Sequence, residues 1–244
     1  MTHHGADSNS IRPLRNVQRM VQLMDRLQTR AFGLEGMAVF YGPSGFGKTF
    51  AAIHCITSYG AIHVVVQDVW TKKFLLKKIA AELGIKPKGC TASISEQVQK
   101  GLSLSGRPLI VDEADRAVKR GMIELIRDIH DNTDTPVILV GEELLPQSLK
   151  RIERVHNRQL EWVAAEPADA RDLKMLTDHY CDGVEIADEL LARILAETNG
   201  SIRRITTNLA RIKELSTVKG LKSVSSEEYT GIFDGEPPKG RGLS

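Results

Sequence analysis

The chain has 244 residues and a formal net charge of +2, so charge balance alone points to no class of partner. Hydrophobic residues make up 41% of the sequence, which is enough for an ordinary globular core. No apolar stretch approaches the roughly 18 residues of a membrane span, no secretion signal is visible, and the three cysteines lack metal-binding spacing. We therefore expect a cytoplasmic protein with reduced thiols and no membrane partner.

The first structured element that the pattern predicts is an amphipathic helix over residues 11–34, preceded by a polar, flexible N-terminus of residues 1–10. Apolar positions recur with helical spacing at Val17, Met20, Val21, Met24 and Leu27. Residues 36–41 then read as a short buried strand.

Residues 42–49 read Gly-Pro-Ser-Gly-Phe-Gly-Lys-Thr and match the phosphate-binding motif G-x-x-x-x-G-K-[ST]. The strand before them and a predicted helix over residues 50–56 supply the order that the motif needs, because loop N–H groups and a helix N-terminus together bind anions. We expect ATP and Mg²⁺ here, with Lys48 at the β- and γ-phosphates and the Thr49 hydroxyl on the metal ion. The predicted nucleotide contacts are Gly42, Pro43, Ser44, Gly45, Phe46, Gly47, Lys48, Thr49 and Phe50.

The next elements are a strand over residues 61–66 and a helix over residues 71–83 that Gly84 ends. The pattern Ser93-x-x-Glu96 predicts a capping box that opens another helix. Lysines are dense in this region, where Glu82 is the single acid among them. They are Lys72, Lys73, Lys77, Lys78, Lys86 and Lys88.

Residues 108–113 read Pro-Leu-Ile-Val-Asp-Glu, a buried strand that delivers two carboxylates to the edge of a parallel sheet. Asp112 is the expected Mg²⁺ partner, through water, and Glu113 is the expected base or orienter for the attacking water. The letters Asp112 to Asp115 also spell a helicase signature, but those enzymes need two tandem nucleotide-binding lobes and this chain has one phosphate loop.

The remaining elements complete an alternation of strands and helices that predicts an α/β fold with a parallel five-stranded sheet. They are a helix near 121–130, a strand over 137–140, a helix over 144–155 and a strand over 160–163. Three predicted helices follow, over 168–180, 186–197 and 202–215. The expected domains are the flexible N-terminus 1–10, the α/β nucleotide-binding domain 11–165, a helical lid domain 166–219 and a flexible tail 220–244, in which Tyr229 and Ile232-Phe233 are candidates for docking.

A phosphate loop, a strand ending in Asp112-Glu113 and a helical domain after the fifth strand resemble the AAA+ ATPases. The resemblance implies a P-loop NTPase fold and Mg²⁺-dependent ATP hydrolysis. It implies that Arg203, in Asn199-Gly200-Ser201-Ile202-Arg203, is the sensor 2 arginine that contacts the γ-phosphate. Sensor 1 is usually a polar residue at the end of the fourth strand, and here the position falls on Glu142, which departs from the family.

The same resemblance places an arginine finger just before the fifth strand, where it acts in the site of a neighbouring subunit of a homo-oligomer. Arg158 is the first candidate because it directly precedes the strand, and Arg154 and Arg151 follow. A basic helix that faces solvent is the plainer interpretation of each.

Within AAA+, the chain resembles the ATPases of DNA transposition, the Mu B-type target-selection proteins, in its size, its Asp112-Glu113-Ala114 signature, its Ala80–Gly84 segment and its short lid. This implies a bacterial or phage-encoded protein that forms a ring or filament with ATP on duplex DNA, without sequence preference, and activates a transposase. The expected DNA contacts, which neutralise phosphates without reading bases, are Lys72, Lys73, Arg116, Lys119 and Arg120.

Two other functions stay open. A helicase loader or replication-initiator-like AAA+ ATPase would differ mainly in its protein partner. A small-molecule kinase with a phosphate loop is disfavoured, because the sequence shows no arginine-rich lid inserted in the sheet domain.

Overall fold

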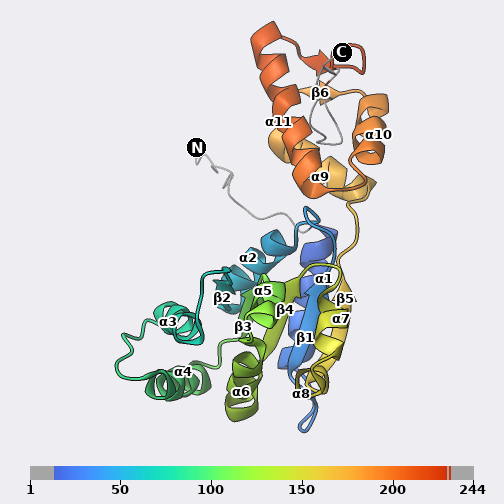
Figure 1. Ribbon diagram of the computed structural model, residues 1–244. Helices are drawn as coiled ribbons and strands as arrows, with labels where there is room; N and C mark the ends of the chain where they lie inside the picture. Colours follow the sequence, from blue (N-terminus) through green and yellow to red (C-terminus); the bar gives the residue numbers. More distant parts are fainter. Residues whose placement is uncertain (1–13, 230, 232–244) are drawn as a thin grey trace, which may run out of the picture. The chain divides into compact units, whose positions relative to one another are not determined.

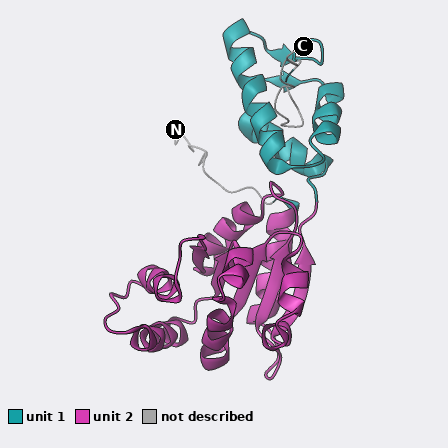
Figure 2. Ribbon diagram, in the orientation of Figure 1, with its two compact units in different colours: residues 1–15, 167–244 teal, residues 16–166 magenta. Residues whose placement is uncertain are grey.

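The computed structural model describes residues 14–229 and residue 231, and the chain divides into two compact units (Figures 1 and 2). The sheet unit is Asn16–Glu166, and the helical unit is Met1–Arg15 together with Pro167–Ser244. The N-terminus of residues 1–10 that we expected to be flexible lies outside the described residues.

Five parallel strands form the centre of the sheet unit, in the order β2-β3-β4-β1-β5 (Figure 1). The strands are β1 Met37–Tyr41, β2 Ile62–Val65, β3 Leu109–Asp112, β4 Val137–Gly141 and β5 Gln159–Ala164. Helical crossovers connect the strands, as parallel pairing requires. The predicted parallel five-stranded sheet is confirmed, and its order puts β4 between the strand before the phosphate loop and the strand that ends in Asp112.

Helices α1 to α8 surround this sheet. They are α1 Arg15–Gln28, α2 Lys48–Tyr59, α3 Lys72–Glu82, α4 Thr91–Ser105, α5 Ala114–Lys119, α6 Ile123–Thr133, α7 Leu145–Lys150 and α8 Glu153–His156. Helix α2 packs against β2, β3 and β4, whereas α3 and α4 pack on each other beyond the β2 edge (Figure 1). No helix in the described part of the chain is long and apolar enough to cross a membrane.

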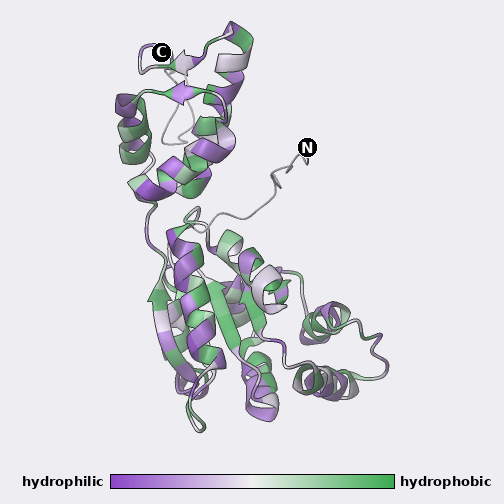
Figure 3. Cartoon of the chain, turned by 180° about the vertical axis from the view of Figure 1, so that it is seen from behind, coloured by the Kyte–Doolittle hydropathy of each residue, from purple (hydrophilic) through white to green (hydrophobic). Residues whose placement is uncertain are grey.

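The core follows the apolar pattern of the strands, which are largely green in the hydropathy view (Figure 3). Val39, Leu109 and Leu139, from three neighbouring strands, are fully buried. Burial of each such side chain stabilises the fold by about 1.5–3 kcal/mol. The sheet is therefore a rigid support for the loops at its carboxyl edge.

The helix expected near 121–130 is confirmed as α6, whereas α5 was not predicted, because six residues give too short a pattern. Two other predictions on the helices of this unit were wrong. The helix expected over 144–155 is broken at Ile152, whose φ of −114° and ψ of 82° are not helical. The capping box at Ser93 is absent, since α4 already starts at Thr91.

The helical unit contains the three helices that the sequence predicts, α9 Ala170–Tyr180, α10 Asp188–Glu197 and α11 Ile202–Lys219. A real capping box opens α9: Asp169 accepts from the backbone N–H of Asp172 at 2.8 Å, and the Asp172 carboxylate accepts from that of Asp169 at 3.4 Å.

The C-terminal tail that we expected to be flexible from residue 220 starts with ordered structure. Strand β7 Ser223–Val224 pairs in parallel with β6 Glu185–Ile186. Tyr229 is buried, and its hydroxyl donates to Asn208 Oδ1 at 2.7 Å. The prediction failed because two-residue strands leave no readable pattern. Ile232 and Phe233 lie outside the described residues.

Candidate nucleotide-binding site

The phosphate loop joins β1 to α2, in the strand-loop-helix order that the motif needs. Gly42, Gly45 and Gly47 have φ values of 154°, 88° and 81°, which only glycine adopts without strain. A Cβ on Gly42 would also lie 3.0 Å from the Ala165 side chain. Because Gly47 directly precedes α2, the loop leads into the positive end of a 12-residue helix, which is an anion site.

Asn16, on α1, holds this loop in place. Its buried amide donates to the carbonyl of Phe46 at 2.7 Å and to that of Glu166 at 2.8 Å, while its oxygen accepts from the Glu166 N–H at 2.9 Å. The sequence analysis missed Asn16, although a polar residue among the apolar positions of α1 is a readable signal.

Lys48 points back into the loop, where its ammonium donates to the carbonyls of Gly42 at 2.6 Å and Pro43 at 2.7 Å. Burial lowers the pKa of Lys48, although the carboxylates of Asp112, Glu142, Glu113 and Asp115 act in the opposite direction. The Lys48 ammonium is surrounded by carboxylates, and a positive charge at this place suits a contact to two phosphates.

Thr49 and Asp112 are brought together as predicted. The Thr49 hydroxyl donates to Asp112 Oδ2 at 2.8 Å, and the Glu113 N–H donates to Asp112 Oδ1 at 2.8 Å. Burial alone would raise the pKa of Asp112, but His63, Thr49 and the Glu113 N–H together lower it. A hydroxyl and an ionised carboxylate are oxygen ligands of the kind that Mg²⁺ prefers, so these residues fit the metal ion.

His63 lies beside this pair and was not singled out in the sequence. Its Nε2 is 3.6 Å from Asp112 Oδ2, slightly too long for a hydrogen bond. The contact arises because β2 pairs with β3, with Val65 opposite Asp112, and His63 shares a face of β2 with Val65.

Glu113, the predicted base, is one of the few non-glycine residues with positive φ, at 57°. It lies at the start of α5, and Arg116 Nη2 is 3.5 Å from its Oε2. Arg116 also donates to the Val66 carbonyl at 3.2 Å and lies 4.0 Å from Asp68. The side chain of the base is therefore in an ion pair with a residue that we predicted to contact DNA.

Glu142 directly follows β4, between the phosphate loop and Asp112 in the strand order. Its backbone N–H donates to Asp115 Oδ2 at 2.7 Å. A Cβ on Gly141 would lie 2.3 Å from that oxygen, so the approach needs glycine. Asp115 thus connects α5 to the residue that follows β4, and the carboxylate of Glu142 acts to raise the pKa of Lys48.

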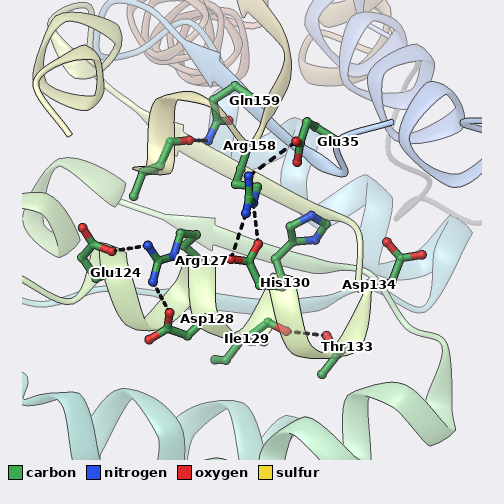
Figure 4. Close-up of polar contacts among 12 residues, drawn as sticks. Glu35, Glu124, Arg127, Asp128, Ile129, His130, Thr133, Asp134, Arg158 and Gln159 are labelled. Atoms are coloured by element: carbon green, nitrogen blue, oxygen red, sulfur yellow. Dashed lines mark hydrogen bonds and ion pairs between the residues drawn. The ribbon is translucent and has the colours of Figure 1, made fainter. Parts of the chain in front are cut away.

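Arg158 lies at the amino edge of the sheet, whereas the phosphate loop lies at the carboxyl edge. The Arg158 carbonyl accepts a hydrogen bond from the N–H of Met37 at the start of β1. Five residues at ~3.3 Å each separate Met37 from Gly42, so Arg158 is about 16 Å from its own phosphate loop. Its guanidinium is ion-paired, with Nε 2.6 Å from Asp131 Oδ1 and Nη1 3.5 Å from Glu35 Oε1 (Figure 4).

Arg151 and Arg154, the other two finger candidates, flank the break between α7 and α8. Both are exposed, and neither forms an ion pair with another residue in the described ranges. Arg203 lies in the first turn of α11, in the helical unit, and is exposed. Its role as sensor 2 stays a prediction.

The two predicted basic clusters, about 45 residues apart in the sequence, follow neighbouring strands in the structure. The loop after β2 leads to Lys72 and Lys73 in the first turn of α3, and α5 follows β3, the neighbouring strand. Asp68, in that loop, lies 4.0 Å from Arg116 and 3.9 Å from Arg120. Lys72 and Lys119 are exposed, whereas Lys73 donates to the Gly89 carbonyl at 3.2 Å.

With this geometry established, comparison with known proteins gives a consistent result. The model of the AAA domain family matches residues 30–149, which include the phosphate loop, Asp112 and Glu113. This part of the chain is therefore similar to the AAA domain family. The AAA domain carries the P-loop fold of the AAA+ proteins, with helices following in the C-terminal part. A search of the curated proteins finds no match.

Solved structures resemble the chain at low sequence identity. The Orc1 protein of Aeropyrum pernix, in complex with DNA, has a TM-score of 0.62 at 21% identity, over 87% of this chain and 62% of that one. Cdc6p of Pyrobaculum aerophilum has 0.67 at 15%, over 93% and 68%. A STAND signal-transduction ATPase of Pyrococcus horikoshii, with a tetratricopeptide repeat sensor, has 0.52 at 14%, over 78% and 29%. The chain spans less than two thirds of the Orc1 chain, and the likeness shows the fold.

Proposed function

We propose that the protein is a Mg²⁺-dependent ATPase whose nucleotide site is coupled to duplex DNA. The observation that carries the proposal is the arrangement at the carboxyl edge of the sheet. There Thr49 of the phosphate loop bonds Asp112, the Glu113 N–H bonds the same carboxylate, and the Glu113 side chain is 3.5 Å from Arg116 of a basic cluster.

Each residue of the site has a task in this reaction. The N–H groups of the loop and Lys48 bind the phosphates, and Thr49 and Asp112 would hold Mg²⁺, which would supply further charge neutralisation there. Glu113 accepts hydrogen bonds from the attacking water and orients it. Glu142 is the candidate for sensor 1 and Arg203 for sensor 2.

The first test is ATP hydrolysis with and without duplex DNA. Lys48→Ala removes the phosphate contact and should abolish nucleotide binding or hydrolysis. Glu113→Gln keeps the Thr49–Asp112 pair but removes the base, so it should bind ATP and hydrolyse it at least about 100-fold more slowly. A normal rate in Glu113→Gln would show that another residue is the base.

The placement of Lys72 and Lys73 supports the DNA part of the proposal. Both are in the first turn of α3, where the helix dipole disfavours cations and where no acid is present. Two lysines at this end weaken the helix but strengthen an anion site, which suits a phosphate backbone. Arg116, Lys119 and Arg120 on α5 extend the same basic surface.

Two finer functions remain as candidates, and the comparisons favour one of them. A helicase loader or replication-initiator-like ATPase fits the similarity to the Orc1 and Cdc6 structures, one of which contains DNA. The transposition candidate, a target-selection ATPase that activates a transposase, keeps the support of the sequence resemblance alone. Copurification of the protein with a replicative helicase or with a transposase, each with ATP and DNA, would separate the two.

A further inference from the structure

His63 is a polar residue in an otherwise apolar strand. Its neighbours Ile62 and Val64 are 0% and 4% exposed, and its own side chain is 11% exposed. Its Nε2 is buried and has no hydrogen-bond partner among the residues that the structure describes. A buried polar atom left without a partner costs about 1–3 kcal/mol, so its presence needs a reason.

A carboxylate oxygen close to this nitrogen indicates that reason. Asp112 Oδ2 is 3.6 Å away, and the same oxygen accepts from the Thr49 hydroxyl at 2.8 Å. An ionised carboxylate can only accept hydrogen bonds, so the tautomer that suits this position has its proton on Nε2. A shift of a few tenths of an ångström would bring the two atoms within hydrogen-bonding distance.

We propose that His63 is a positioning residue for the Mg²⁺ site, because its Nε2–H holds the Asp112 carboxylate in the orientation that the metal ion needs. The proposal rests on the Mg²⁺-dependent nucleotide binding that we propose above. Carboxylates that serve a metal ion are themselves oriented by outer hydrogen-bond partners, whose loss typically weakens metal binding 10- to 100-fold. Asp112 has Thr49 and the Glu113 N–H as partners, and after that small shift His63 would be a third, from the neighbouring strand.

The experiment compares amides of different reach at one position. His63→Gln places an amide N–H at about the distance of Nε2, whereas the shorter side chain of His63→Asn does not. His63→Leu removes the donor, and His54→Leu is the control, since His54 on α2 bonds Ser58. Binding of a non-hydrolysable ATP analogue is titrated by fluorescence anisotropy in EDTA and at increasing Mg²⁺ concentrations, and the melting temperature is recorded without nucleotide.

We expect the affinity in EDTA to be the same in all variants. In each titration, Mg²⁺ raises the affinity for the analogue, and the midpoint is the Mg²⁺ concentration that gives half of this gain. We expect the midpoint to rise about tenfold in His63→Asn and His63→Leu. It should change little in His63→Gln and in His54→Leu. Parent-like Mg²⁺ dependence in His63→Asn overturns the inference. So does an equal loss of affinity in EDTA, which would mean that His63 only supports the fold. A parent protein that binds the analogue without any effect of Mg²⁺ would instead contradict the proposed function.

Discussion

At the scale of single residues, Glu113 combines the features that mark a functional position. Its backbone is in the left-handed region at φ 57° and ψ 40°, which carries about 1–3 kcal/mol of strain for a residue other than glycine. This backbone conformation places the Glu113 side chain at the end of β3, beside Arg116. Arg116 is therefore ion-paired with the predicted base in this structure.

We predict that Arg116→Ala raises ATP hydrolysis in the absence of DNA. The ion pair with Glu113 is partly exposed, with about 40% of each side chain accessible, so it is worth at most about 1 kcal/mol. Releasing the carboxylate should raise the basal rate no more than about fivefold and should reduce the further stimulation by DNA. Arg120→Ala is the matched control, because Arg120 contacts Asp68 and not Glu113. An unchanged basal rate in Arg116→Ala would show that the ion pair does not restrain the base.

The residues that the sequence predicts correctly to lie together are those that belong to contiguous motifs. Lys48, Thr49 and Asp112 have fixed places relative to a glycine loop or the end of an apolar strand. His63 and Asp115 reach the site through the order of the strands and through a contact between α5 and β4. No local spacing encodes those neighbours, so they become visible only in the folded chain.

At the scale of elements, the region between β4 and β5 changes which arginine is the best candidate for the arginine finger. Arg158 joins the start of β5 to Asp131 of α6 and to Glu35 before β1 (Figure 4). An arginine held by two carboxylates must leave both before it can act in another subunit. Arg154, at the start of α8, is exposed and forms no ion pair with any residue in the described part of the chain.

We therefore predict that Arg154→Ala lowers ATP hydrolysis about 1000-fold while nucleotide affinity changes little, because a finger acts in trans on the transferred phosphoryl group. Arg158→Ala should mainly lower the melting temperature. Mixing tests the assignment: Arg154→Ala subunits keep an intact phosphate loop, and Glu113→Gln subunits keep an intact finger. Mixed oligomers should recover part of the activity that neither variant has alone. If activity instead recovers only when Arg158→Ala subunits, and not Arg154→Ala subunits, are mixed with Glu113→Gln subunits, Arg158 is the arginine finger.

The elements that sequence patterns predicted well are the long or strongly apolar ones, such as α1, β1 and β4. Helix α5 has six residues and α8 has four, which is too short for a hydrophobic period to be read. The break at Ile152 carries neither glycine nor proline, so the chain offers no local sign of where α7 ends. The unpredicted helix α5 and the unpredicted break between α7 and α8 both lie in segments that contain candidate functional arginines.

At the scale of the whole molecule, a net charge of +2 conceals an uneven distribution. The first turn of α3 and helix α5, which follow the neighbouring strands β2 and β3, carry the predicted basic side chains, and Asp68 of the β2–α3 loop pairs with Arg116 and Arg120. The sequence predicted each cluster, but their proximity depends on the pairing of β2 with β3. If these side chains bind DNA as proposed, one subunit would offer few phosphate contacts, and tight binding would require several subunits along one duplex.

We predict that duplex DNA binding requires ATP, shows little sequence preference and weakens steeply with salt. Each neutralised phosphate contributes a slope of about −0.9 to the dependence of the logarithm of affinity on that of salt concentration. Replacing Lys72 and Lys73 with Ala should weaken binding to all sequences alike and flatten this slope, while ATP binding stays intact. The matched control replaces Lys77 and Lys78 with Ala. These lysines are exposed further along α3, so the control removes the same amount of charge at a place more distant from the β2–α3 loop. Anisotropy titrations at several salt concentrations distinguish the pairs, since equal effects would mean that overall charge, and not the surface at the sheet edge, binds the duplex.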